Sequence, residues 1–112
     1  MRVFLDACVD PRTAAIFAGH DAGQPLNWVG SRLKDNVLLP RVAEQFDVLV
    51  TIDQGLEHEH NLRALQFGIV IVHVPKNKVE FYRAFASELL AAVSETKPGT
   101  VCHVPDEGLR RK

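Results

Sequence analysis

The sequence has little of what several common protein classes require. It contains two cysteines, Cys8 and Cys102, and no CxxC or Cys/His spacing joins them, which excludes a zinc ribbon. Free thiols are the favoured state, and a disulfide is the poorer alternative. No apolar stretch approaches the length that spans a bilayer, and Asp6 interrupts the N-terminal apolar run, so no signal peptide is visible. We therefore expect a soluble, cytoplasmic protein with no membrane partner.

An excess of charge of one sign is also missing. The formal net charge is −1, so no global positive field indicates nucleic acid, and any basic contact surface must be local. The three cations at 110–112 are the best candidate for such a surface. With 112 residues, 46% of them hydrophobic, the chain is long enough for one domain, 1–112, with a real core.

What the sequence does contain is an alternation of strand-like and helix-like segments. Strands are predicted over 3–5, 21–26, 48–52, 69–72 and 100–104, with 21–26 an edge strand at best. Helices are predicted over 13–18, 36–45, 56–65 and 79–93. Pro40 is expected to kink or shorten the second helix. Because the strands read as unbroken apolar runs, we predict an α/β fold: a three-layer α/β/α sandwich with a mainly parallel central sheet.

Two of the predicted strands end on a carboxylate, Asp6 and Asp53. Ligands of open parallel sheets bind beyond the carboxyl ends of the strands, near a switch in strand order. On neighbouring strands, roughly 5 Å apart, the two carboxylates would converge, and a hard divalent cation such as Mg²⁺ or Mn²⁺ would offset their repulsion. Such a site can activate water for attack on a phosphodiester. Asp35, at a helix start, is the candidate third acid, with helix capping as the alternative role for each.

These residues resemble the pattern of the PIN-like domain proteins, small predicted nucleases related to VapC-type toxins of bacterial toxin–antitoxin systems. The resemblance covers nearly the whole chain, through Val3-Phe-Leu-Asp6, Asp35-Asn-Val-Leu38, Val48-Leu-Val-Thr-Ile-Asp53, Gly68-Ile-Val-Ile-Val72, the helix from 79, and Pro98-Gly-Thr-Val101. It implies a PIN-like fold and a hydrolase that cleaves RNA with Mg²⁺ or Mn²⁺. It also implies that Asp6, Asp35 and Asp53 hold the metal, and that a cognate antitoxin is the protein partner.

Two positions depart from the family pattern. Ala7 stands where a second acid usually follows the first aspartate, and Gly55 stands where the motif T-x-D-x-D-F has its second aspartate. Fewer carboxylates hold a cation less tightly, which favours an alternative: a catalytically depleted module that binds RNA or protein. Asp10, Glu57 and Glu59 are candidate replacements for the missing acids.

A receiver-like phosphoacceptor domain is a third alternative. Receivers carry adjacent acids after the first strand and a lysine at the end of the last strand. Here Ala7 follows Asp6, and the last strand ends Val104-Pro105, so this interpretation ranks lower.

Histidines and aromatic residues add weaker signals. The run 57–60 looks like a metal cluster, but on a helix its two histidines point to different faces, so a solvated first turn is the preferred interpretation. His73 and His103 lie in or beside apolar strands and are interpreted as core or rim residues, with a general-base role as the alternative. Trp28 and Tyr82 are candidates for stacking on bases, although a position in the core or in an interface suits Tyr82 better. A homo-oligomer stays open.

Overall fold

The computed structural model describes residues 2–6, 9–17, 19–23, 35–56, 61–76 and 78–105, without the side chains of 11 and 35–37. Its centre is one parallel sheet, made of β1 (Arg2–Leu5), β2 (Asp21–Gly23), β3 (Val48–Thr51), β4 (Gly68–Val72) and β5 (Val101–Val104). The strand order is β2-β1-β3-β4-β5. After β1 the chain adds β2 on one side and β3 on the other, so the sheet has its switch in strand order at β1 and β3.

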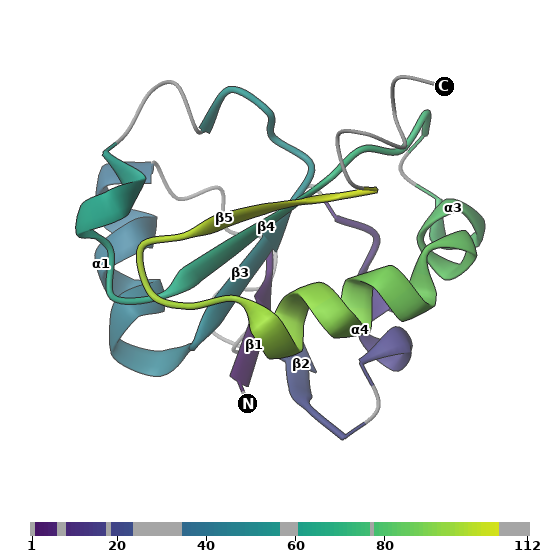
Figure 1. Cartoon of the computed structure of the whole chain (residues 1–112), viewed down its shortest axis with the longest axis horizontal. Coiled ribbons are helices and arrows are strands. Elements are labelled where there is room, and N and C mark those ends of the chain that lie inside the picture. The colour runs from purple at the N-terminus through teal and green to yellow at the C-terminus, as the bar shows by residue number, and fades with distance from the viewer. Residues whose placement is uncertain are drawn as a thin grey trace.

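Helices cover both faces of the sheet (Figure 1). Helix α1 (Asp35–Gln45) packs on one face, with the short 3₁₀ helix η3 (Leu62–Ala64) beside the same core. The 3₁₀ helix η1 (Pro11–Ile16), α3 (Val79–Ala84) and α4 (Ala86–Glu95) lie on the other face. The predicted three-layer α/β/α arrangement with a parallel sheet is therefore confirmed.

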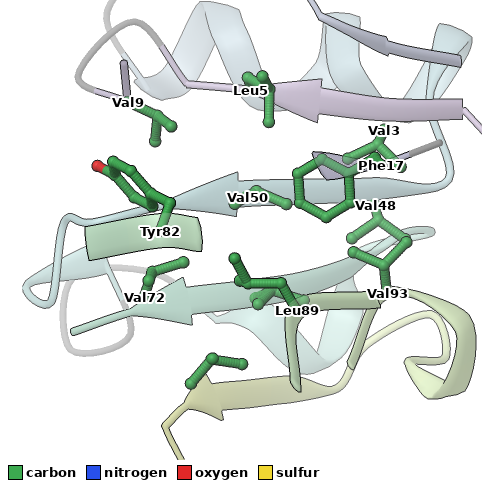
Figure 2. Close-up of a cluster of buried hydrophobic side chains, with 12 residues drawn as sticks. Val3, Leu5, Val9, Phe17, Val48, Val50, Val72, Tyr82, Leu89 and Val93 are labelled. Carbon is green, nitrogen blue, oxygen red and sulfur yellow. The ribbon is translucent and has the colours of Figure 1, made fainter. Parts of the chain in front are cut away.

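Strand alternation divides the apolar residues between two cores. In β1, Val3 and Leu5 join the core under α3 and α4, whereas Phe4 joins the core under α1. Figure 2 shows the first of these cores, in which Tyr82 and Leu89 reach the strand residues and are fully buried. Complete burial of one large aliphatic side chain stabilises a fold by about 1.5–3 kcal/mol. The core position expected for Tyr82 is confirmed.

The helix predicted over 79–93 is in fact two helices. Helix α3 ends and α4 begins at Phe85, whose backbone angles, φ −111° and ψ 22°, are not helical. No proline or glycine lies at the break. The physical reason is tertiary packing, because α3 contacts η1 whereas α4 contacts β4 and β5. A single straight helix cannot follow both surfaces.

The helix predicted over 36–45 is confirmed as α1, whereas two other predicted helices differ in length or type. The segment predicted over 13–18 is η1, which Asp10 caps by accepting a hydrogen bond from the backbone N–H of Arg12. Within 56–65, the described residues are Leu56, which starts a helix, and 61–65, which contain η3. Residues 57–60 lie outside the description. Helix α1 continues past Pro40 to Gln45, so the proline does not end it.

The described part of β2, Asp21–Gly23, covers the first half of the strand predicted over 21–26. Residues 24–34 lie outside the description. In the described part of the chain, no helix combines the length and the apolar character that crossing a bilayer requires.

Candidate functional site

Asp6 follows β1 directly and is held against β3 by two hydrogen bonds. Its backbone N–H donates to the carbonyl of Val50 at 3.0 Å, which continues the β1–β3 ladder. Its carboxylate Oδ2 accepts a hydrogen bond from the hydroxyl of Thr51 at 2.8 Å. Thr51 is fully buried, so its hydroxyl has a fixed direction, and the Asp6 carboxylate is fixed with it.

Asp53 is linked to the same hydroxyl. The backbone N–H of Asp53 donates to Thr51 Oγ1 at 3.0 Å, and the Asp53 carboxylate Oδ1 accepts from the N–H of Gly55 at 3.0 Å. These two local bonds turn the chain immediately after β3. The buried hydroxyl of Thr51 therefore connects the carboxylate of Asp6 with the backbone of the turn that carries Asp53.

Both carboxylates are bonded to neutral donors. Asp6 is half-buried, Asp53 is exposed, and neither forms an ion pair with a basic residue in the described ranges. A hydroxyl and a backbone N–H orient a carboxylate without cancelling its charge. This end of β1 and β3 therefore has two negative charges that attract a cation.

Asp35 is the third acid that the sequence suggested. Helix α1 begins at Asp35, and a helix between two parallel strands runs back against them, so it begins at the carboxyl end of the sheet (Figure 1). The backbone of Asp35 is thus at the same end of the sheet as Asp6 and Asp53. Its side chain lies outside the described part of the structure, so its role as cap or ligand is a prediction.

Asp10 was a candidate replacement for a missing acid, and its carboxylate is already engaged. Oδ1 accepts from the backbone N–H and the Nε of Arg12 at 3.0 and 3.2 Å, and Oδ2 pairs with Nη2 of the same residue at 2.8 Å. The hydrogen bonds from the Arg12 side chain, and then from its backbone, hold the pKa of Asp10 below its usual value. Asp10 thus has a structural role at the start of η1.

Two histidines form a contact that the sequence did not predict. His73 follows β4, His103 lies in β5, and His73 Nε2 is 2.8 Å from His103 Nδ1. The backbone N–H of His73 donates to the carbonyl of Val104 at 2.7 Å, which keeps the first ring beside the second. The pairing depends on the adjacency and register of β4 and β5. The available sequence signal was that both residues lie at the ends of apolar runs.

Asp6, Thr51 and the histidine pair share one face of the sheet. By strand alternation Asp6 lies on the side of Phe4, Thr51 on the side of Leu49, and His73 on the side of Ile71, all of them core residues under α1. His103 lies on the side of Val101, which packs against the same core. The carboxyl ends of β1, β3, β4 and β5 thus bring polar groups to one edge, on the α1 face.

The donors at this edge fit a magnesium-type ion better than other metals. Mg²⁺ and Mn²⁺ prefer oxygen, and Mg²⁺ is commonly held by one or two carboxylates together with several waters. Asp6 and Asp53 supply that number. In the described ranges, no group of three or more His, Cys, Asp or Glu side chains is placed to hold an ion, so an all-protein calcium cage or a closed zinc site does not fit those residues.

Several residues considered from the sequence lie outside the described part. They are Cys8, Trp28, the run 57–60 and the basic tail 110–112. Cys102 is described as a free thiol, half-buried in β5.

Comparisons of the chain with models of protein families, with curated proteins and with solved structures find no match.

Proposed function

We propose that this protein is a Mg²⁺- or Mn²⁺-dependent endoribonuclease of the PIN-like kind, with its site at the carboxyl ends of β1 and β3. The sequence resemblance suggests the class. The position of Asp6 and Asp53 at the switch in strand order supports it, because parallel α/β sheets bind their ligands there. The same resemblance suggests the toxin of a toxin–antitoxin system, with a cognate antitoxin protein as partner.

The single observation that carries this proposal is the hydrogen bond of 2.8 Å from Thr51 to Asp6. The donor, Thr51, is the last residue of β3, and the backbone N–H of Asp53 is bonded to the same hydroxyl. Thr51 therefore positions both the carboxylate of Asp6 and the backbone of Asp53. A carboxylate bonded to a neutral donor is a ligand of the kind that Mg²⁺ and Mn²⁺ prefer.

The residues of the chain have distinct parts in such a reaction. Asp6 and Asp53 hold the cation, and Thr51 keeps Asp6 aimed at it by occupying Oδ2. Asp35 assists from the start of α1. When bound, Mg²⁺ or Mn²⁺ activates a water and stabilises the negative charge that develops on the phosphodiester. Cleavage of RNA then breaks one P–O bond, and the water supplies the oxygen that replaces it.

The test is cleavage of single-stranded RNA by the purified full chain with Mn²⁺. We expect Asp53→Asn and Asp6→Asn to abolish cleavage without unfolding the protein, because the amide keeps an oxygen for the bonds from Gly55 and Thr51 but loses the charge. Asp21→Asn is the matched control, because this acid has an 82% exposed side chain at the amino end of β2. Undiminished cleavage by Asp53→Asn would contradict the proposal.

A depleted module that binds RNA or protein is the second candidate. The absence of a three-residue metal group in the described ranges favours it, as do Ala7 and Gly55 in place of acids. Tight RNA binding by wild-type protein without Mn²⁺-dependent cleavage would support this module. Labelling of Asp53 by acetyl phosphate would instead support the receiver-like alternative.

A further inference from the structure

Arg12 combines a fixed guanidinium group with an outer edge that faces solvent. Its Nε and Nη2 donate to the two carboxylate oxygens of Asp10 at 3.2 and 2.8 Å. The Asp10 side chain is only 9% exposed, whereas the Arg12 side chain is 67% exposed. A guanidinium has five N–H donors in one plane. Two of them are bonded to Asp10, and the other three have no partner among the described residues.

Asp10 is itself held in place from two elements. Its Oδ1 also accepts the backbone N–H of Arg12 at 3.0 Å, and the backbone N–H of Val79, where α3 begins, bonds to the same carboxylate. The position of Asp10 therefore does not depend on the Arg12 side chain alone. A guanidinium that is already oriented loses less side-chain entropy when it binds a ligand, and its free edge matches two oxygens of a phosphate.

Asp10 and Arg12 lie at the same end of the sheet as the proposed cation site. The backbone N–H of Val9 donates to the carbonyl of Asp6 at 2.9 Å. Covalent geometry then places the Cα of Asp10 within about 11 Å of the Cα of Asp6. Asp6 lies on the α1 face, whereas η1 packs on the opposite face. A polymer that crosses this edge of the sheet therefore passes the cation site and Arg12 in turn.

Glu80 is the neighbouring charge that opposes an anion at Arg12. It is exposed in the first turn of α3, and its charge acts on Arg12, although these two described side chains form no ion pair. Lys78, which directly precedes α3, is also exposed and adds a positive charge on this side. Removing the charge of Glu80 would therefore change the potential at Arg12 without breaking a contact of the described residues.

We propose that Arg12 is a phosphate-binding residue for single-stranded RNA and that Asp10 is the residue that positions it. The identity of the ligand as RNA rests on the proposed function. Because Arg12 belongs to the face of the sheet opposite to Asp6, it contacts a phosphate other than the one that is cleaved. The outer edge of its guanidinium donates to two oxygens of that phosphate, while the inner edge stays bonded to Asp10.

The test measures RNA binding without cleavage, by fluorescence anisotropy of a labelled single-stranded oligonucleotide with the full chain, in EDTA and over a series of salt concentrations. Each phosphate that a protein neutralises on a single strand contributes about −0.7 to the slope of log affinity against log salt. We expect Arg12→Gln to weaken binding about ten-fold at low salt and to reduce the slope by about 0.7. Arg12→Lys keeps the charge but not the planar fork, so the slope should stay and the affinity should fall less.

Glu80→Gln separates RNA binding from the packing of η1. It should tighten binding about two-fold, because it removes a negative charge near Arg12 and leaves the bonds between Arg12 and Asp10 in place. If Arg12 only held η1 together, this variant would bind RNA as wild type does. Arg63→Gln is the matched control, an exposed arginine in η3 before the amino end of β4, and should leave affinity and slope unchanged. Wild-type affinity and slope in Arg12→Gln, an equal loss in Arg63→Gln, or no tightening in Glu80→Gln would overturn the proposal.

The two proposals fail in different ways. If the RNA contact is wrong but the nuclease is right, Arg12→Lys and Glu80→Gln cleave RNA with the wild-type KM, and Asp53→Asn is inactive. If the nuclease is wrong but the contact is right, wild type and Asp53→Asn both bind RNA with a salt dependence that Arg12→Gln reduces, and no variant cleaves RNA with Mn²⁺.

Discussion

The acids at the two ends of the sheet differ in whether they have a basic partner. At the amino end, Arg2 donates its backbone N–H to Asp47 at 2.8 Å, places its side chain 3.8 Å from Asp21, and lies over the ring of Phe46 at 5.1 Å. The ion pair there joins Arg2 to Asp21, whereas Asp47 accepts a hydrogen bond from a backbone N–H. At the carboxyl end, Asp6 and Asp53 are bonded to a hydroxyl and a backbone N–H, and to no basic side chain among the described residues.

An ion pair and an acid bonded to neutral donors have different consequences for ligand binding. Paired charges at an exposed edge contribute little to stability and are screened by salt, but they leave no net charge for a ligand. Acids held by neutral donors keep their charge and their direction. Among the described residues, Asp21 thus has a basic partner at the amino end, whereas Asp6 and Asp53 have none at the carboxyl end.

The largest expected effect is on cation binding. Calorimetric titration with Mn²⁺ should show one site in wild type, weakened more than about ten-fold in Asp6→Asn and in Asp53→Asn, because each variant removes one charged ligand. Asp47→Asn at the amino end should leave the affinity unchanged. If Asp47→Asn weakened Mn²⁺ binding as much, cation binding would not be specific to the carboxyl end of the sheet.

At the amino end of β4, we expect an added side-chain atom to lower the stability of the fold. A Cβ on Gly68, the first residue of β4, would overlap the side-chain oxygen of Thr96 and lie 2.7 Å from its methyl carbon and 3.1 Å from the carbonyl of Lys97. We expect Gly68→Ala to lower the free energy of unfolding by about 1–3 kcal/mol, measured by urea denaturation. Adding Thr96→Ala should recover part of the loss, and no recovery would place the strain elsewhere.

Removal of the Thr51 hydroxyl should have a smaller effect on stability than on the site. Thr51→Val keeps the shape of a buried side chain but leaves Asp6 and the Asp53 N–H without a partner. We expect a loss of about 1 kcal/mol in the free energy of unfolding, together with weaker Mn²⁺ binding. Thr51→Ser, which keeps the hydroxyl, is the control. Full Mn²⁺ affinity in the valine variant would show that Asp6 needs no orientation.

The smallest effect concerns Asp10, the acid near the carboxyl end of β1 that does have a basic partner. Arg12 holds the pKa of Asp10 below its ordinary value of 3.8, so the unfolded chain takes up this proton first. The resulting stability is present above 3.8 and is lost as the pH falls from that value through the lower pKa of the folded state. Arg12→Gln should therefore differ from wild type near neutral pH and approach it in acid. A constant difference across a pH series of urea unfolding curves would contradict this.

Much of the fold was predictable because the strands are long apolar runs. The segment 69–72 reads as a strand covered on both faces, and β4 is buried on both. The break at Phe85 was not predictable, because no proline or glycine marks it and the separate contacts of α3 and α4 are known only from the structure. The 3₁₀ form of η1, and its cap by Asp10, were likewise not predicted.

The candidate site was predictable in outline only. Carboxylates at two strand ends indicated Asp6 and Asp53, since parallel strands bring their carboxyl ends to one edge. The central position of Thr51 depends on the β1–β3 register, which pairs residues 45 apart. The contact of His73 with His103 depends on the β4–β5 register in the same way. Neither strand register can be deduced from the spacing of residues along the chain.

The complete enclosure of β4 has a consequence for the unfolding protein. Gly68–Val72 is a pentapeptide, GIVIV, without charge or proline, and only its neighbours β3 and β5 prevent it from meeting a second copy of itself. Such segments form dry, fibril-like stacks when exposed. Detachment of β5 alone opens one side of this strand, so heat-induced aggregation should begin there while the rest of the sheet is still folded.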